Sequence, residues 1–63
     1  MPISINAHHY FAYLAKRIDS HPNEAFKSNL RAYLDAGKLA FMAGDINTML
    51  RCCAHINTEL SHS

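Results

Sequence analysis

Tryptophan is absent from this chain and cysteine is scarce. The two cysteines among its 63 residues are neighbours, Cys52 and Cys53, so they cannot join distant segments through a disulfide. The opening stretch MPISINAHHYF lacks both the basic start and the long apolar run of a signal peptide. Together these absences predict a protein of a reducing, cytoplasmic compartment.

Long apolar runs and an excess of one charge are also missing. The longest apolar run, residues 39–43, is far shorter than the roughly 20 residues that span a membrane, so we expect no membrane association. Six Lys and Arg stand against five Asp and Glu, which gives a net charge of +1 and little attraction for nucleic acid. The charges are spaced for pairs along a solvated helix face, at Glu24–Lys27, Arg31–Asp35 and Asp35–Lys38.

Motifs of catalysis are missing as well. The sequence contains no glycine-rich phosphate loop, no clustered carboxylates, and no serine or cysteine with a base at motif spacing. We therefore expect no enzyme activity, no catalytic residue and no cofactor.

One stripe of side chains has the composition of a metal site. Cys52, His55 and Glu59 follow one another at helical spacing and offer three formal zinc ligands. The paired Cys-x-x-Cys and His-Glu-x-x-His motifs are absent, however, and polar residues opposite an apolar seam are typical of a solvated helix face. The neighbours His8 and His9 cannot face one ion from a helix. We predict a solvated face and no metal site.

Two breaks divide the chain into three predicted helices, near residues 5–20, 22–43 and 45–61. Pro22 suits the first turn of a helix because it lacks an N–H group. Gly44 readily takes the left-handed conformation that ends a helix, and Asp45 is a strong cap for the next one. Gly37 marks a kink or an end of the helix, or lets another helix approach closely, and we expect the helix to continue through it.

Each predicted helix carries an apolar seam at steps of three and four residues, and no segment alternates as a strand does. The sequence therefore predicts a single all-α domain over residues 1–63, a three-helix antiparallel bundle or a helical hairpin, that dimerises. The seams are Ala7, Phe11, Leu14 and Ile18; Phe26, Leu30, Tyr33, Gly37 and Ala40, with Leu34 and Phe41 alongside; and Ile46, Met49, Cys53, Ile56 and Leu60.

The prediction of a dimer rests on residues 39–43, which are apolar around the whole circumference of their helix. Such a helix must be covered on more than one side. Phe41 and Met42 project about 100° apart, so a single neighbouring helix does not bury both. A symmetric homodimer would cover the remainder and add to a core that is marginal at this length. The predicted partner or dimer interface comprises Tyr13, Leu39, Phe41, Met42 and Met49.

Residues 40–55 support a weaker alternative. Ala40-x-x-x-Gly44, with Leu50 and Cys53 after it, is similar to the helix-turn-helix of small DNA-binding repressors. Asp45 departs from that pattern, because such turns carry an aliphatic residue there and an acid repels phosphate. An ordinary helical hairpin produces the pattern as easily. In this alternative the DNA contacts are Asn47, Thr48, Arg51 and His55.

The stretches MPISINAHHYFAYLAKRIDSHPNEAF and MLRCCAHINTELSHS resemble the short early proteins that bacteriophage lambda encodes between its exonuclease and excisionase genes. The resemblance covers the whole chain, and the family offers no motif from which site residues transfer. It implies a non-enzymatic early protein of the bacterial host cytoplasm that modulates host physiology or the choice between lysis and lysogeny. Our leading hypothesis is an accessory protein that binds itself and an unidentified host or phage protein through helix contacts.

Overall fold

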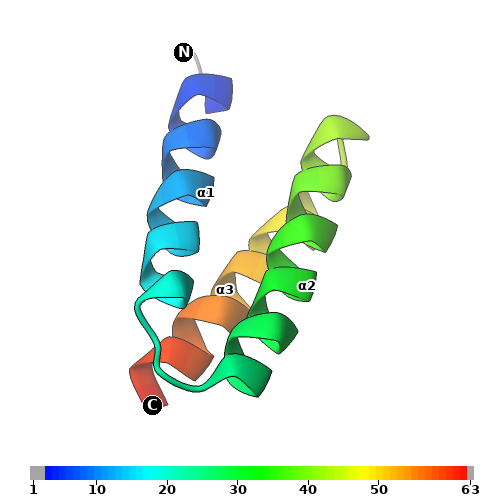
Figure 1. Ribbon diagram of the computed structural model, residues 1–63. Coiled ribbons are helices and arrows are strands. Elements are labelled where there is room, and N and C mark those ends of the chain that lie inside the picture. Colours follow the sequence, from blue (N-terminus) through cyan, green and yellow to red (C-terminus); the bar gives the residue numbers. More distant parts are fainter. Residues whose placement is uncertain (1–2, 63) are drawn as a thin grey trace.

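The computed structural model describes residues 3–62 of the chain, with side chains from residue 7 onward. Within that part the chain forms three α-helices and no strand: α1 (Ile3–Asp19), α2 (Glu24–Met42) and α3 (Ile46–His62). The helices run up, down and up, with short connections at opposite ends of a rod of 36 × 17 × 16 Å (Figure 1). The prediction of an all-α bundle is confirmed. No described helix has the length and apolar content of a membrane span.

The first connection starts α2 two residues later than the sequence suggests. Asn23 is the N-cap, because its side-chain oxygen accepts a hydrogen bond of 3.0 Å from the backbone N–H of Phe26. The Asn23 N–H in turn donates to Nδ1 of His21 at 3.1 Å. The predicted start at Pro22 is wrong because an asparagine that accepts a helix N–H is the stronger cap, and it leaves the proline outside the helix.

The second connection confirms the boundary predicted at Gly44 and Asp45. Gly44 has a φ of 82°, which a glycine adopts without steric cost. The N–H groups of Gly44 and Asp45 donate to the carbonyls of Phe41 and Ala40 at 3.0 and 2.8 Å, the pattern of a Schellman motif. The Asp45 carboxylate then caps α3, accepting from the Thr48 N–H at 3.2 Å and from its hydroxyl at 2.6 Å.

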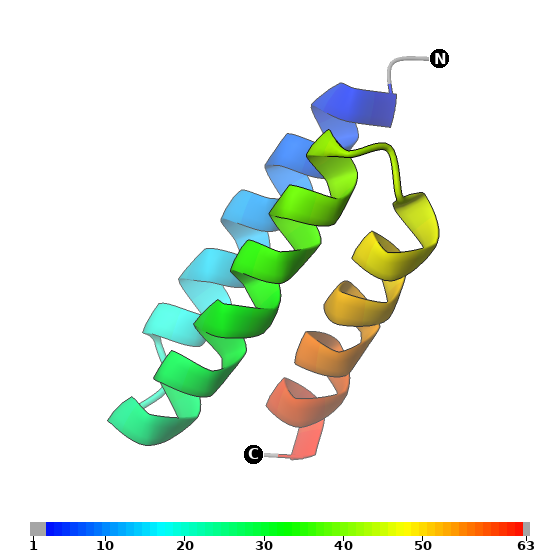
Figure 2. The same cartoon turned by 90° about the vertical axis from the view of Figure 1, so that its right-hand side faces the viewer.

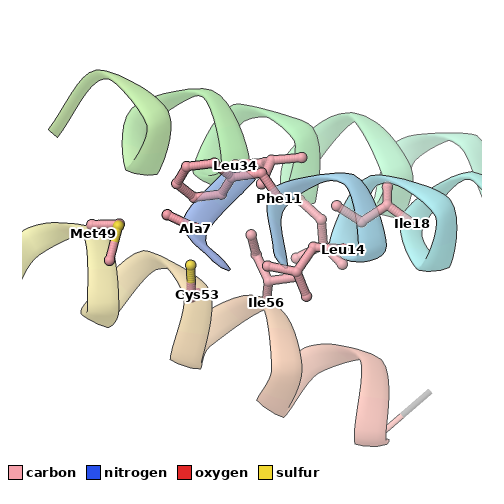
Figure 3. Close-up of a cluster of buried hydrophobic side chains, with 9 residues drawn as sticks. Ala7, Phe11, Leu14, Ile18, Leu34, Met49, Cys53 and Ile56 are labelled. Carbon is pink, nitrogen blue, oxygen red and sulfur yellow. The ribbon is translucent and has the colours of Figure 1, made fainter. Parts of the chain in front are cut away.

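The core forms where the three apolar seams meet, and Figure 3 shows side chains of all three helices pointing toward one another. The seam of α1 is buried as predicted. At the edges the prediction is wrong, because Tyr33 and Ile46 keep 38% and 41% of their surface exposed. The buried residues are Ala7, Phe11, Leu14, Ile18, Leu30, Leu34, Met49, Cys53 and Ile56.

Helices α2 and α3 form the most closely packed pair of the bundle. Gly37 is buried inside α2, which continues through it without interruption. A Cβ atom placed on Gly37 would lie 3.3 Å from the Cβ of Cys52 and 3.9 Å from the carbonyl oxygen of Met49. The glycine therefore lets α3 approach the backbone of α2, one of the roles that the sequence suggested for it.

Polar contacts tie α1 to both neighbours. Arg31 of α2 pairs with Asp19 at the end of α1, rather than with Asp35 as its spacing in the sequence suggested. On the other side, the side chain of Asn57 in α3 accepts a hydrogen bond of 3.4 Å from Arg17 and donates one to the hydroxyl of Tyr10. These contacts supplement the apolar packing of α1, whose backbone approaches its neighbours less closely than α2 and α3 approach each other.

Candidate interaction surface

A groove of about 310 Å³ lies between α1 and α2, near the last turn of α2. Phe41 stands in it, with its ring centroid 5.9 Å from the rings of Phe11 and His8 and edge-on to both. The small side chains of the α1 wall leave the space open. The groove is lined by His8, Phe11, Ala12, Ala15, Lys38, Phe41 and Met42.

Beside the groove, α2 presents two uncovered apolar side chains. Met42 is 81% exposed and Leu39 is 67% exposed, more than any other large hydrophobic residue in the described part of the chain. They are three residues apart, so they are neighbours on the surface of the helix. Burying one such side chain contributes about 1.5–3 kcal/mol of favourable free energy, so contact between this patch and another apolar surface is favourable.

The structure divides the predicted interface among several places. Phe41 and Met42 line the groove, whereas Leu39 does not line it and is exposed on the outer side of α2, next to Met42. Met49 is only 8% exposed and belongs to the core, so its predicted place at the interface is wrong. The side of α3 that carries it faces α2, a pairing that the apolar spacing of α3 alone does not reveal (Figure 3).

Tyr13 is exposed, but on the side of α1 that faces α3. Its ring stacks on Tyr10 at 6.1 Å, and the guanidinium carbon of Arg17 lies 5.7 Å from its centre. Arg17 and Tyr10 also share hydrogen bonds with Asn57 of α3. This cluster therefore closes the α1–α3 seam, and Tyr13 does not join the surface around Met42.

The residues of the DNA-binding alternative do not form a free recognition face. Helix α3 runs beside α2 in the opposite direction (Figure 2), whereas the helices of a helix-turn-helix cross at about 90–120°. The ring of His55 lies on that of Tyr33, with centroids 4.0 Å apart. The N–H and hydroxyl of Thr48 are both bound by Asp45. Two of the four predicted DNA contacts, His55 and Thr48, are therefore engaged within the α2–α3 hairpin, while Asn47 and Arg51 stay exposed.

The polar stripe of α3 is less solvated than its sequence suggests. Cys52, His55 and Glu59 are all half-buried, because this side of the helix lies against α2. Cys53 is buried in the core, and burial raises the pKa of its thiol, with the neighbouring Cys52 adding to the rise. Among residues 3–62, no three His, Cys, Asp or Glu side chains are placed to hold a metal ion.

Comparison of the chain with models of protein families, with curated proteins and with solved structures found no match. The geometry of the site therefore carries the functional argument. The described residues offer an apolar groove with two uncovered side chains at its edge. An exposed apolar surface of this kind is suited to bind another apolar surface.

Proposed function

We propose that the protein is a non-catalytic interaction protein that binds helices through the open end of the α1–α2 pair, the end at which the groove beside Phe41 lies. The observation that carries this proposal is the groove around Phe41 together with the exposed side chains of Leu39 and Met42 beside it. A monomer leaves the side chains of Leu39 and Met42 exposed to water. A partner that covers them gains the free energy of their burial.

The groove suits an amphipathic helix. In this mode of recognition, apolar side chains at helical spacing enter a groove between two helices of the receptor. Phe41 is half-buried in the groove, and contacts with the rings of Phe11 and His8 already fix its position. Its side chain therefore loses little conformational freedom when a partner binds. Preorganisation of this kind lowers the entropic cost of association.

One partner in this proposal is a second copy of the chain. The described core contains nine buried hydrophobic residues, which is little for a stable fold. A symmetric dimer extends that core across the open end of the bundle, and binding of the folded state adds to its stability by mass action. The other partner is an unidentified host or phage protein that presents a similar helix.

The biological setting is part of the same proposal. The resemblance to the short early proteins of bacteriophage lambda supports an accessory protein made in the cytoplasm of a bacterial host. In that setting, binding to a helix of a host or phage protein changes the activity of that protein. The proposed outcome is a change in host physiology or in the choice between lysis and lysogeny.

Replacement of the two exposed side chains tests the function. The variant Leu39→Ser/Met42→Ser removes the apolar patch, and Ala32→Ser/Ala36→Ser makes a matched change on exposed positions of the same helix. We expect the thermal midpoint of the wild type and the control to rise with protein concentration, and that of the patch variant to stay constant. Used as baits, wild type and control should retain the same host or phage protein, and the patch variant should lose it. Equal behaviour of all three proteins would contradict the proposal.

A further inference from the structure

The two methionines whose side chains the structure describes lie in opposite surroundings. Met42 is the last residue of α2 and is 81% exposed, whereas Met49 of α3 is 8% exposed and belongs to the core. An oxidant dissolved in water must reach a thioether sulfur before it can react with it, so exposure controls which methionine is modified. A peroxide that meets the folded protein therefore oxidises Met42 well before Met49.

Met42 is also the residue that the groove and the exposed apolar patch share. It lines the groove together with Phe41, and it is the surface neighbour of Leu39, which lies three residues earlier in α2. The unbranched, polarisable side chain of methionine adapts to irregular apolar surfaces and is frequent where proteins bind one another. A change in the polarity of this one side chain therefore alters both parts of the proposed interaction surface.

The oxidation requires only a peroxide. A lone pair of the Met42 sulfur attacks one oxygen of hydrogen peroxide and the O–O bond breaks. The transferred oxygen then gives up its proton to the departing hydroxide, which leaves as water. Sulfur is oxidised by two electrons and the peroxide is reduced by two. The product is a methionine sulfoxide, a polar and chiral group that disrupts methionine-containing interfaces.

We propose that Met42 is a site of reversible oxidation that switches off the interaction surface beside the groove. In the free protein the sulfoxide oxygen faces water, so the fold is kept, but burial against an apolar partner leaves that oxygen without a hydrogen-bond donor. A methionine sulfoxide reductase, supplied with two electrons by thiols, restores the thioether and with it the binding. This inference rests on the proposed function, because the oxidation acts on the surface described there.

Peptide mapping tests the site. The folded protein is treated with dilute hydrogen peroxide and then with dithiothreitol, which reverses thiol oxidation and leaves sulfoxides in place. Cleavage before each aspartate puts Met42 in the peptide 35–44 and Met49 in the peptide 45–63. We expect Met42 to oxidise at least about tenfold faster than Met49, with unchanged circular dichroism. Equal rates, or loss of helix once Met42 is oxidised, overturn the proposal.

Binding measurements test the switch. The variant Met42→Gln imitates the polar sulfoxide, and Met42→Leu keeps an apolar side chain that a peroxide cannot oxidise. By sedimentation equilibrium we expect a dimer dissociation constant at least about tenfold higher for the oxidised wild type and for Met42→Gln. Both should also lose the protein that the native bait retains. Peroxide should leave Met42→Leu unaffected, and reductase treatment should restore the wild type.

Two results separate this inference from the proposed function. If the wild type oxidised at Met42 associates and retains its partner as tightly as the native protein does, the switch is overturned while the interaction surface stands. If the native protein neither associates with itself nor retains a partner, the proposed function fails and the switch fails with it.

Discussion

Gly37 of α2 lies against Cys52 of α3, so closely that a Cβ atom on the glycine would come within 3.3 Å of the cysteine Cβ. Contacts at this separation force the neighbour to give way by a few tenths of an ångström. At this point the backbone of α2 packs directly against a side chain of α3, whereas α1 packs less closely on the other two helices. The groove beside Phe41 lies between α1 and α2, the side of α2 away from this contact.

A large side chain at Gly37 should separate this hairpin. We expect Gly37→Leu to lower the free energy of unfolding by about 1–3 kcal/mol or more, because overpacking outweighs the helix propensity that leucine adds. The control is Ala36→Leu, which makes a similar change on the exposed face of α2. Urea unfolding followed by circular dichroism at a fixed protein concentration measures both. Equal stability of the two variants would mean that the two helices do not meet at Gly37.

The two neighbouring cysteines should behave differently despite their adjacency. Cys53 is 4% exposed and burial raises the pKa of its thiol, so it stays protonated and inaccessible at neutral pH. We expect iodoacetamide to modify Cys52 first in the native protein, as peptide mass spectrometry can show. We also expect Cys53→Ser to cost about 1–3 kcal/mol through the buried hydroxyl, and the half-buried Cys52→Ser to cost less. Equal labelling rates would contradict the burial of Cys53.

The cap of α3 should respond to acid. The hydrogen bonds from the side chain and backbone of Thr48, followed by the charge of Arg51, hold the pKa of Asp45 below its ordinary value. A carboxylate whose pKa is lowered by folding stabilises the folded state above its ordinary pKa of about 3.9, and that stability is lost as pH falls through the lower folded value. The variant Asp45→Asn keeps a side-chain acceptor but cannot titrate. Between pH of about 5 and about 2 the thermal midpoint of the wild type should therefore fall more than that of the variant, and parallel curves would refute the cap's contribution.

Asn57 should control how firmly α1 is attached. Its side chain links Arg17 and Tyr10 of α1 to α3, and its removal leaves both without that partner. We expect Asn57→Ala to lower stability by about 1–2 kcal/mol. Hydrogen–deuterium exchange should accelerate in α1 more than in α2 or α3. The neighbouring exposed Thr58→Ala is the control, and exchange that rises equally in all three helices would show a general loss of stability instead.

The helices and most of the core follow from sequence because both depend on neighbours three and four residues away. The α1 seam and the Gly44–Asp45 boundary are examples, since periodicity and cap chemistry act within a single helix. The start of α2 required a choice between two local signals, Pro22 and Asn23, and only the hydrogen bond to Phe26 decides it. Local chemistry therefore fixed each helix to within a few residues.

The pairing of helix sides is what the sequence could not provide. Periodicity names a face, but it does not say which neighbour that face meets, so Met49 was placed at an interface and Cys52 in solvent. Lys38 and His8 line one groove only because α1 and α2 run antiparallel, which brings positions 30 residues apart in sequence together. The same holds for the ion pair of Arg31 with Asp19, which spans two helices.

Sedimentation equilibrium of the wild-type protein tests the central claim, that the open end of the α1–α2 pair is a binding surface whose first partner is a second copy. At micromolar concentration we predict a species of twice 7.1 kDa that dissociates on dilution. The Leu39→Ser/Met42→Ser variant should remain at 7.1 kDa under the same conditions. A wild type that sediments as a 7.1 kDa monomer throughout the concentration range would contradict the account.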